Sequence, residues 1–144
     1  MRFGPGFAST FFYYFVTTTI IMTAIALRST GLSLDSGIPQ QLGLILGLLG
    51  GGVGGYFNRT TEFEVSSTNP AKLVRSLEAV LEEMGYEVNE EEDELEDNIS
   101  LYQRVGLRAL FSGNVFVQVE TRKVTVAARF ISMKRIQAAL EELD

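Results

Sequence analysis

The 144-residue chain contains no histidine and no cysteine. This lack excludes nucleophiles paired with histidine, histidine general bases, thiolate zinc sites and iron–sulfur clusters held by cysteine. It also excludes disulfide bonds and haem attached through cysteine. Carboxylates are abundant, but they lie in a charged run rather than in an apolar setting that would raise a pKa for acid catalysis. We therefore expect a protein that is not an enzyme and has no cofactor or metal site; catalysis by carboxylates alone is the alternative.

Charge is missing from two long stretches, residues 7–27 and 38–57. At 1.5 Å per residue, a helix of the first length spans about 31 Å, which matches a hydrocarbon core of about 30 Å. We expect Asp35 and Ser36 to cap the second helix and Pro39 to fit its first turn. The sequence thus predicts a transmembrane helical hairpin over residues 1–59.

Glycines recur every four residues in the second stretch, at Gly43, Gly47, Gly51 and Gly55. Each internal glycine costs about 1 kcal/mol relative to alanine in a helix in water, but a bilayer leaves the backbone no other partner. The spacing lines the glycines along one face, where another helix can approach closely. A bare glycine-rich nucleotide motif within this run follows no strand, so we interpret these glycines as helix-packing residues.

Two different helices could pack on this glycine face: the first helix of the same chain or a helix of a partner protein. We expect Gly43 and Gly47 to pack on the first helix, and a partner protein to occupy the face from Gly51 to Gly55. The residues of the first helix that we expect to meet the glycines are small: Ala8, Thr17, Thr18 and Ala24.

The first apolar stretch has an alternative interpretation as a cleaved signal peptide, because Ala24-Ile25-Ala26 resembles a cleavage site. The weak positive region before it and its length favour a membrane anchor. Two spans return the chain to the side where it began. Arg2 and Arg59 flank the outer ends, and Lys72 and Arg75 follow soon after. The positive-inside rule then places the C-terminal domain on the cytoplasmic or stromal side.

Residues 60–144 have the composition of a soluble α+β domain. Alternation predicts strands at 61–66, 86–88, 99–103, 115–120 and 124–128, with a hairpin turn at 121–123. Two apolar stripes predict helices, the first begun by Asn69-Pro70 and the second capped by Ser132. Their inner faces are Leu73, Leu77, Val80, Leu81 and Met84, and then Met133, Ile136, Leu140 and Leu143. The order β-α-β-β-β-β-α predicts two helices packed on a mostly antiparallel sheet.

Charge is segregated within this domain. Residues 61–97 hold thirteen acidic and two basic residues, whereas residues 98–135 hold seven basic residues and one acid. We expect the acidic run 90–97 to be a solvated loop, with docking of a basic partner as the alternative. It lacks the ligand spacing and the turn glycine of an EF-hand, which disfavours calcium.

The basic segment pairs with these acids within the fold, or it contacts anionic lipid headgroups or a protein partner. The candidate contact residues are Arg104, Arg108, Phe111, Arg122 and Lys123. Residues 107–111 form either a short link with Leu110 and Phe111 buried in the domain, or an interfacial element against lipid. A net charge of −6 and the lack of interleaved aromatics exclude nucleic acid as a partner.

The two glycine-rich spans precede a domain that contains LYQR at residues 101–104, LFSGNVFVQV at 110–119 and VTVAAR at 124–129. In this the chain resembles small two-span thylakoid proteins of cyanobacteria and chloroplasts, and is similar to the family called cofactor assembly of complex C. That family helps attach haem to the cytochrome b6 subunit of the cytochrome b6f complex. The resemblance implies an assembly role in a photosynthetic membrane. It assigns no haem ligand here, because the chain has neither histidine nor cysteine.

Together these features favour a non-catalytic assembly factor or accessory subunit of an integral membrane complex. The alternative is a membrane-tethered scaffold that recruits a soluble partner through its acidic loop or a sheet edge.

Overall fold

The computed structural model describes residues 3–89 and 98–142. The chain divides into two compact units, residues 5–59 and residues 60–144, and the N-terminal residues before Pro5 group with the second unit. The acidic run 90–97 and Leu143 lie outside the described residues. We describe each unit by itself.

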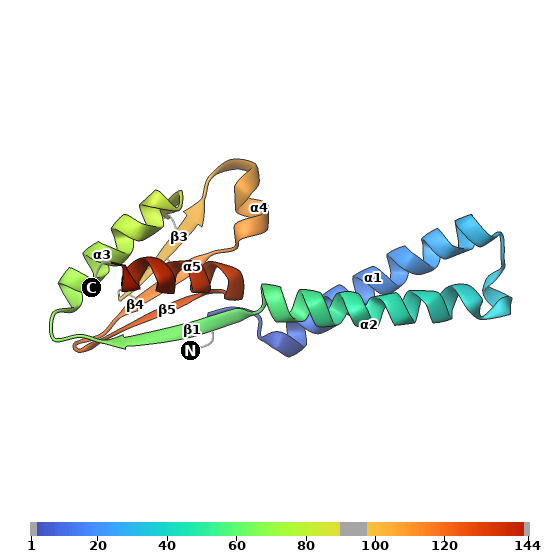
Figure 1. The fold of residues 1–144 in the computed structure, drawn as a ribbon, viewed down its shortest axis with the longest axis horizontal. Coiled ribbons are helices and arrows are strands. Elements are labelled where there is room, and N and C mark those ends of the chain that lie inside the picture. Colours follow the sequence, from blue (N-terminus) through green and yellow to red (C-terminus); the bar gives the residue numbers. More distant parts are fainter. Residues whose placement is uncertain (1–2, 90–97, 143–144) are drawn as a thin grey trace. The chain divides into compact units, whose positions relative to one another are not determined.

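The first unit is a helical hairpin. Helix α1 covers Phe7–Thr30, a short 3-10 turn η1 covers Leu34–Ser36, and helix α2 covers Ile38–Asn58 (Figure 1). Pro39 lies in the first turn of α2, as predicted. The predicted caps were wrong: Asp35 and Ser36 belong to η1, and Gly37 takes the N-cap position with φ 72°. Glycine adopts this left-handed conformation at little cost, which allows the sharp entry into α2.

The two helices differ as candidate membrane spans. Among the described residues, α1 alone is long and apolar enough to cross a membrane by length and composition, and its place near the N-terminus also fits a signal sequence. Helix α2 is 21 residues long and uncharged. Its mean hydropathy is lower than that of α1's most apolar window because seven glycines and two glutamines accompany the leucines. The membrane span expected over residues 38–57 is therefore a helix whose hydropathy alone does not identify it.

The second unit is an α+β domain with a five-stranded antiparallel sheet in the order β1-β5-β4-β3-β2. The strands are β1 (Thr60–Ser66), β2 (Tyr86–Val88), β3 (Ile99–Arg104), β4 (Val115–Val119) and β5 (Lys123–Arg129). The helices are α3 (Pro70–Glu83) and α5 (Phe130–Glu141), with η2 (Gly106–Arg108) and α4 (Ala109–Ser112) linking β3 to β4. The predicted order of strands and the two long helices is confirmed, and the link is helical.

Both long helices pack on one face of this sheet. Leu81 of α3 and Ile136 of α5 are completely buried in one cluster with Val115, Val117 and Val126 of the central strands. Helix α3 begins as predicted, because the Asn69 side chain accepts a hydrogen bond from the backbone N–H of Lys72.

The start of α5 was predicted wrongly. The helix begins at Phe130, directly after β5, and Ser132 lies inside its first turn. Because β5 runs into α5 without a loop, no residue is left to act as a side-chain cap. The Ser132 hydroxyl instead lies 3.2 Å from the Tyr86 hydroxyl and joins α5 to β2.

The opposite face of the sheet is also covered. Leu101 and Ala127 flank Phe116 in the sheet, and both are buried. The ring of Phe3 stacks on Phe116 with the ring centroids 5.7 Å apart. The segment that precedes α1 therefore packs on the α+β domain, a contact that the sequence pattern does not reveal.

Candidate functional site

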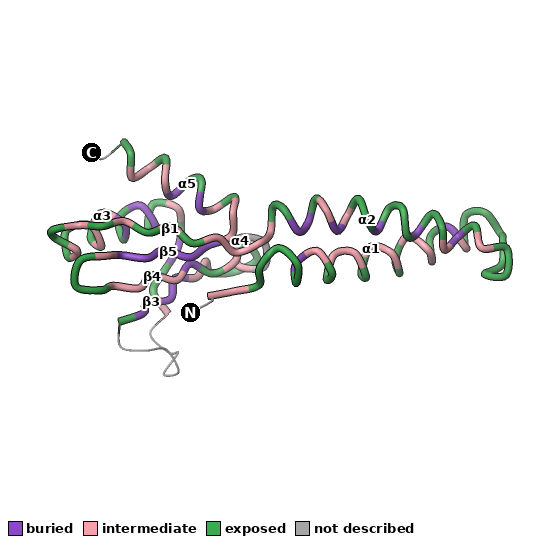
Figure 2. Tube along the Cα trace, turned by 90° about the horizontal axis from the view of Figure 1, so that it is seen from below, coloured by how far each residue is buried: buried purple, intermediate pink, exposed green. Residues whose placement is uncertain are grey.

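Helix α2 turns a face of small residues toward the interior of the hairpin and large apolar residues outward. Five glycines of α2 are buried, including all four of the ladder: Gly43, Gly47, Gly51, Gly54 and Gly55. Large apolar side chains of the same helix point outward and are exposed: Leu42, Leu44, Ile45, Leu48, Leu49 and Val53. Buried and exposed residues alternate along α2 with the helical repeat (Figure 2). This is the reverse of a helix in the core of a soluble protein.

Helix α1 covers the whole glycine ladder. A Cβ atom on Gly43 would overlap the hydroxyl of Thr23, and one on Gly47 would overlap that of Thr19 and lie 3.0 Å from the carbonyl oxygen of Phe15. The two backbones therefore approach so closely that even alanine would not fit without a shift. The glycine hydrogens point at the threonine oxygens, as in the Cα–H···O contacts found between helices. The Thr19 hydroxyl oxygen is buried and has no hydrogen-bond partner, so the Cα–H group of Gly47 is the polarised group that it contacts.

The glycines near the end of α2 also pack on α1. A Cβ on Gly51 would lie 3.0 Å from the side chains of Phe11 and Phe15, and one on Gly55 would lie 3.0 Å from the Phe11 backbone. Helix α1 thus occupies the face from Gly51 to Gly55, where we expected a partner protein. Gly52, by contrast, has no atom within 4 Å of its Cβ position.

The residues of α1 that meet the ladder differ from those expected. Of the four small residues predicted, Thr18 lies against Gly50, whereas Ala8, Thr17 and Ala24 are exposed. The contacting residues are instead spaced by four, in phase with the glycines: Phe11, Phe15, Thr19 and Thr23. Residue size alone could not identify this face, because β-branched and aromatic side chains fill the groove that the glycines leave.

The predicted contact residues of the basic segment lie at two ends of the sheet. Arg122 and Lys123 lie at the β4–β5 turn, where Lys123 Nζ is 2.8 Å from Glu64 Oε1. The hydrogen bond to Glu64 raises the pKa of Lys123. This pair agrees with the interpretation that acids of the same fold neutralise part of the segment.

Arg104 and Arg108 lie at the other end of the sheet, where β3 ends and η2 begins. The Arg104 guanidinium lies 4.8 Å from the centre of the Tyr86 ring. Arg108 is exposed. The side chains of Leu110 and Phe111, and with them their predicted contacts, lie outside the described part of the structure. The four candidates whose side chains the structure describes therefore lie in two pairs at opposite ends of the sheet instead of in one site.

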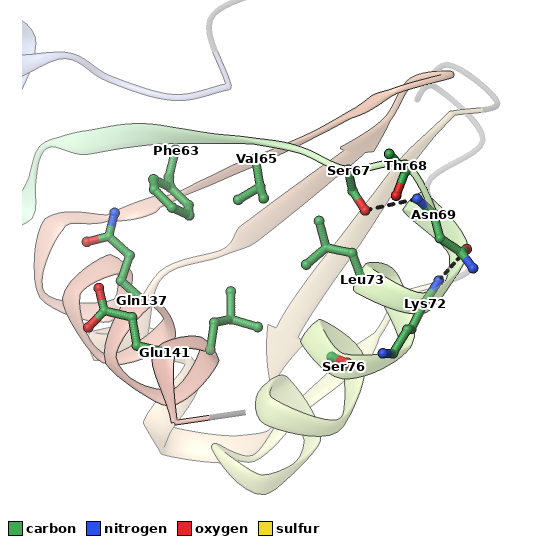
Figure 3. A pocket seen from close by; sticks show the side chains of 11 residues that line it. Phe63, Val65, Ser67, Thr68, Asn69, Lys72, Leu73, Ser76, Gln137 and Glu141 are labelled. Carbon is green, nitrogen blue, oxygen red and sulfur yellow. Dashed lines mark hydrogen bonds between the residues drawn. The ribbon is translucent and has the colours of Figure 1, made fainter. Parts of the chain in front are cut away.

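A pocket of about 540 Å³ opens beside edge strand β1, between the start of α3 and the end of α5 (Figure 3). Its apolar lining comes from Phe63 and Val65 of β1, Leu73 of α3 and Leu140 of α5. Its polar lining is Ser67, Thr68, Asn69, Lys72, Ser76, Gln137 and Glu141. An amphipathic pocket of this volume is typical of binding sites for small molecules or for a side chain of a partner. No motif in the sequence marks it, because its residues come from three separate elements.

Tyr102 has a strongly raised pKa, and it does not line this pocket. Burial, reinforced by the nearby charge of Glu78 and its hydrogen bond, raises the pKa of Tyr102 to about 12. Its hydroxyl donates to Glu78 Oε1 over 3.1 Å and so connects β3 to α3. The raised pKa belongs to the domain core and does not indicate a catalytic tyrosine.

This contact predicts a loss of stability in alkali. The pKa of Tyr102 is higher in the folded than in the unfolded chain, so its stabilisation is complete below pH 10 and is lost as the pH rises to 12. We expect the free energy of unfolding of the α+β domain to fall by about 2–3 kcal/mol over this interval through Tyr102. Urea titrations of the wild type and of Tyr102→Phe measure the difference. An equally steep fall in Tyr102→Phe would contradict the assignment; Tyr13→Phe, on the exposed side of α1, is the matched control.

Among the described residues, no group of three or more acidic side chains is arranged to hold a metal ion. Neither a protein-family model, nor a curated protein, nor a solved structure matches this chain.

Proposed function

We propose that the chain is a non-catalytic, membrane-anchored module in which both helices of the hairpin span the bilayer and hold the α+β domain at its surface. Its role is that of an assembly factor or accessory subunit of an integral membrane complex. The resemblance described above favours a photosynthetic complex of the thylakoid membrane. The observation that carries the proposal is the arrangement of the hairpin, with glycines inside and large apolar residues outside.

Physical chemistry supports the anchor. Both helices expose many large apolar side chains, among them Phe12 and Ile20 of α1 and Leu48 and Val53 of α2, and exposed apolar patches mark membrane or protein interaction sites. Hydrocarbon removes this surface from water, and close packing of glycines then holds the helices together where no hydrophobic force acts between them. At the end of α2, the Arg59 guanidinium lies 4.6 Å from the Tyr56 ring centre, a pair suited to the membrane interface.

The second candidate, a tethered module that recruits a soluble partner, is supported by the pocket beside β1. Because α1 covers the glycine ladder, that face is not available for a partner helix without opening the hairpin. The pocket, in contrast, combines an apolar lining with exposed polar groups such as Lys72 and Glu141. In this version the acidic run and the pocket, rather than the membrane helices, would select the partner.

The proposal predicts a defined topology. Because the natural chain has no cysteine, single cysteines can be introduced at exposed Ser33, between the helices, and Thr121, in the β4–β5 turn. We expect a membrane-impermeant maleimide to label the two positions from opposite sides of sealed vesicles. We also expect the chain to stay in the membrane after an alkaline carbonate wash.

Other outcomes have clear meanings. Release by carbonate would contradict the anchor. Labelling of both cysteines from one side would contradict the two spans. A mature chain that lacks the residues up to Ala26, measured by intact mass, would identify α1 as a cleaved signal sequence instead.

A further inference from the structure

Both chain connections between the α+β domain and the hairpin leave the domain at the same place. A Cβ atom on Gly4 would lie 3.1 Å from Cβ of Thr60, so these two residues are neighbours. The residues that follow Gly4 and precede Thr60, Pro5 and Arg59, belong to the hairpin unit. We call the end of the sheet at Thr60, which pairs with Arg129, the tethered end. No linker lies between α2 and β1 beyond Arg59 itself.

The loop after β3 projects from this tethered end. Strand β3 ends at Arg104, which pairs with Tyr86, and the next residues carry bare aliphatic side chains. Val105 is 68% exposed and Leu107 is 81% exposed, which is more than any other large apolar side chain of the described residues. At about 4.8 Å between strands, β3 lies three strand spacings, about 14 Å, from β1. A single residue spans up to about 3.6 Å, so Arg59 alone limits how far the start of β1 can lie from the end of α2.

Contacts to β5 and α5 hold the end of the loop between β3 and β4 in place. Gly113, at its return into β4, lies against the side chain of Arg129, because a Cβ there would come within 2.7 Å of Arg129 Cδ. The Ser132 hydroxyl donates to the carbonyl oxygen of Ser112 over 3.4 Å. The aliphatic side chains of this loop are thus presented by a structured element, although nothing in the described domain covers them.

Cations of the central strands and of the loop gather at this end of the sheet, whereas the edge strands place the acids Glu62 and Glu87 near it. Arg104, Arg108 and Arg129 lie here, and within residues 98–135 the single acid is Glu120. Glu120 lies at the opposite end, where its backbone N–H donates to the Lys123 carbonyl oxygen. Aliphatic side chains bordered by arginines suit the interface of an anionic membrane, where each cation near the surface contributes about 1 kcal/mol.

We propose that the loop after β3 is a membrane-surface contact: Val105 and Leu107 enter the headgroup region, while Arg104 and Arg108 bind anionic lipid headgroups. The contact rests on the membrane anchor proposed above. It fixes the orientation of the domain on the bilayer and leaves the pocket beside β1, which is lined by the start of α3, for a partner. The pocket lies away from this loop, because Ser67 at its edge binds the backbone of Arg122 at the far end of the sheet.

Depth-dependent quenching in nanodiscs tests the contact with the full chain. A single cysteine replaces Leu107, with Thr121→Cys as the matched control at the opposite end of the sheet, and each carries the same environment-sensitive fluorophore. The discs contain phosphatidylcholine alone or mixed with phosphatidylglycerol, plus a lipid with a nitroxide on its headgroup. In the mixed discs we expect quenching at position 107 to exceed that at position 121 severalfold. Arg108→Glu should reduce this excess, Arg108→Lys should keep it, and salt should weaken it.

Three results would overturn the contact. Equal quenching at positions 107 and 121 would show that the loop does not reach the lipid. Equal quenching in neutral and anionic discs would reject recognition of anionic headgroups. A fluorophore at 107 that is shielded from water but not quenched by lipid would indicate a protein surface instead. Failure of the chain to enter discs at all would contradict the anchor rather than this contact, so the two proposals fail separately.

Discussion

Replacing Gly47 with leucine will separate the two helices of the hairpin. The position of a leucine Cβ overlaps the Thr19 hydroxyl and lies 3.0 Å from the backbone carbonyl of Phe15, which cannot move aside as a side chain can. Overpacking of this kind costs about 1–3 kcal/mol and more where backbone must shift. In the proposed membrane-spanning hairpin, close packing at the glycines is the main force between the helices, so we expect this cost to exceed the packing energy that remains.

Distances between spin labels measure this separation. Cysteines at Phe12 and Val53 carry the labels, because both side chains are exposed on the outside of the hairpin. The unsubstituted hairpin should give one narrow distance distribution in lipid, and Gly47→Leu a broad distribution shifted to longer distances.

Gly52→Leu is a closely matched control for Gly47→Leu. Gly52→Leu adds the same side chain to the same helix, at a position with no atom within 4 Å. It should leave the distribution unchanged. If Gly47→Leu and Gly52→Leu behaved alike, the contact between the glycine ladder and α1 would not be what holds the hairpin together.

Replacing Leu81 with alanine will destabilise the α+β domain severely while leaving the hairpin intact. Leu81 is completely buried where α3 packs on the sheet, beside Leu77 and Tyr102 in one cluster. Removing such a side chain leaves a cavity and typically costs about 2–5 kcal/mol, a large share of the stability of a small domain. Because the chain forms two compact units, we expect them to unfold as separate cooperative structures.

Hydrogen exchange measured by mass spectrometry reports both units in one experiment. Amides of β5, the second strand from the β1 edge, should lose most of their protection in Leu81→Ala, whereas amides of α2 should keep theirs. Leu107→Ala makes the same chemical change at a side chain that is 81% exposed and should leave β5 protected. Loss of protection in α2 as well would contradict the independence of the two units.

Much of the fold could be predicted because its signals are local. Alternation of apolar residues defined the five strands, and Asn69-Pro70 defined the start of α3, since a side-chain cap acts within one turn. The caps at Asp35, Ser36 and Ser132 were wrong for a common reason. Each is a good capping residue, but the geometry of the chain connection placed the helix start elsewhere, at Gly37 and at Arg129.

Contacts between distant segments were beyond the reach of the sequence pattern. The glycine spacing identifies a face on α2, but the matching face of α1 depends on how the two helices are rotated against each other. That rotation selects Phe11, Phe15, Thr19 and Thr23 over the smaller residues Ala8 and Ala24. The pocket beside β1 and the stacking of Phe3 on Phe116 likewise join segments that lie far apart along the chain.

The sequence by itself determined that the chain has an uncharged helical part and an α+β part, and that histidine and cysteine chemistry is absent, because composition and periodicity act locally. Only the tertiary structure decided which surfaces are used and which are free. It covers the glycine ladder with α1 and places Leu107 bare at the tethered end of the sheet. Both outcomes depend on long-range packing, in which residues meet through the topology of the sheet and the phase of the helices rather than through their order in the chain.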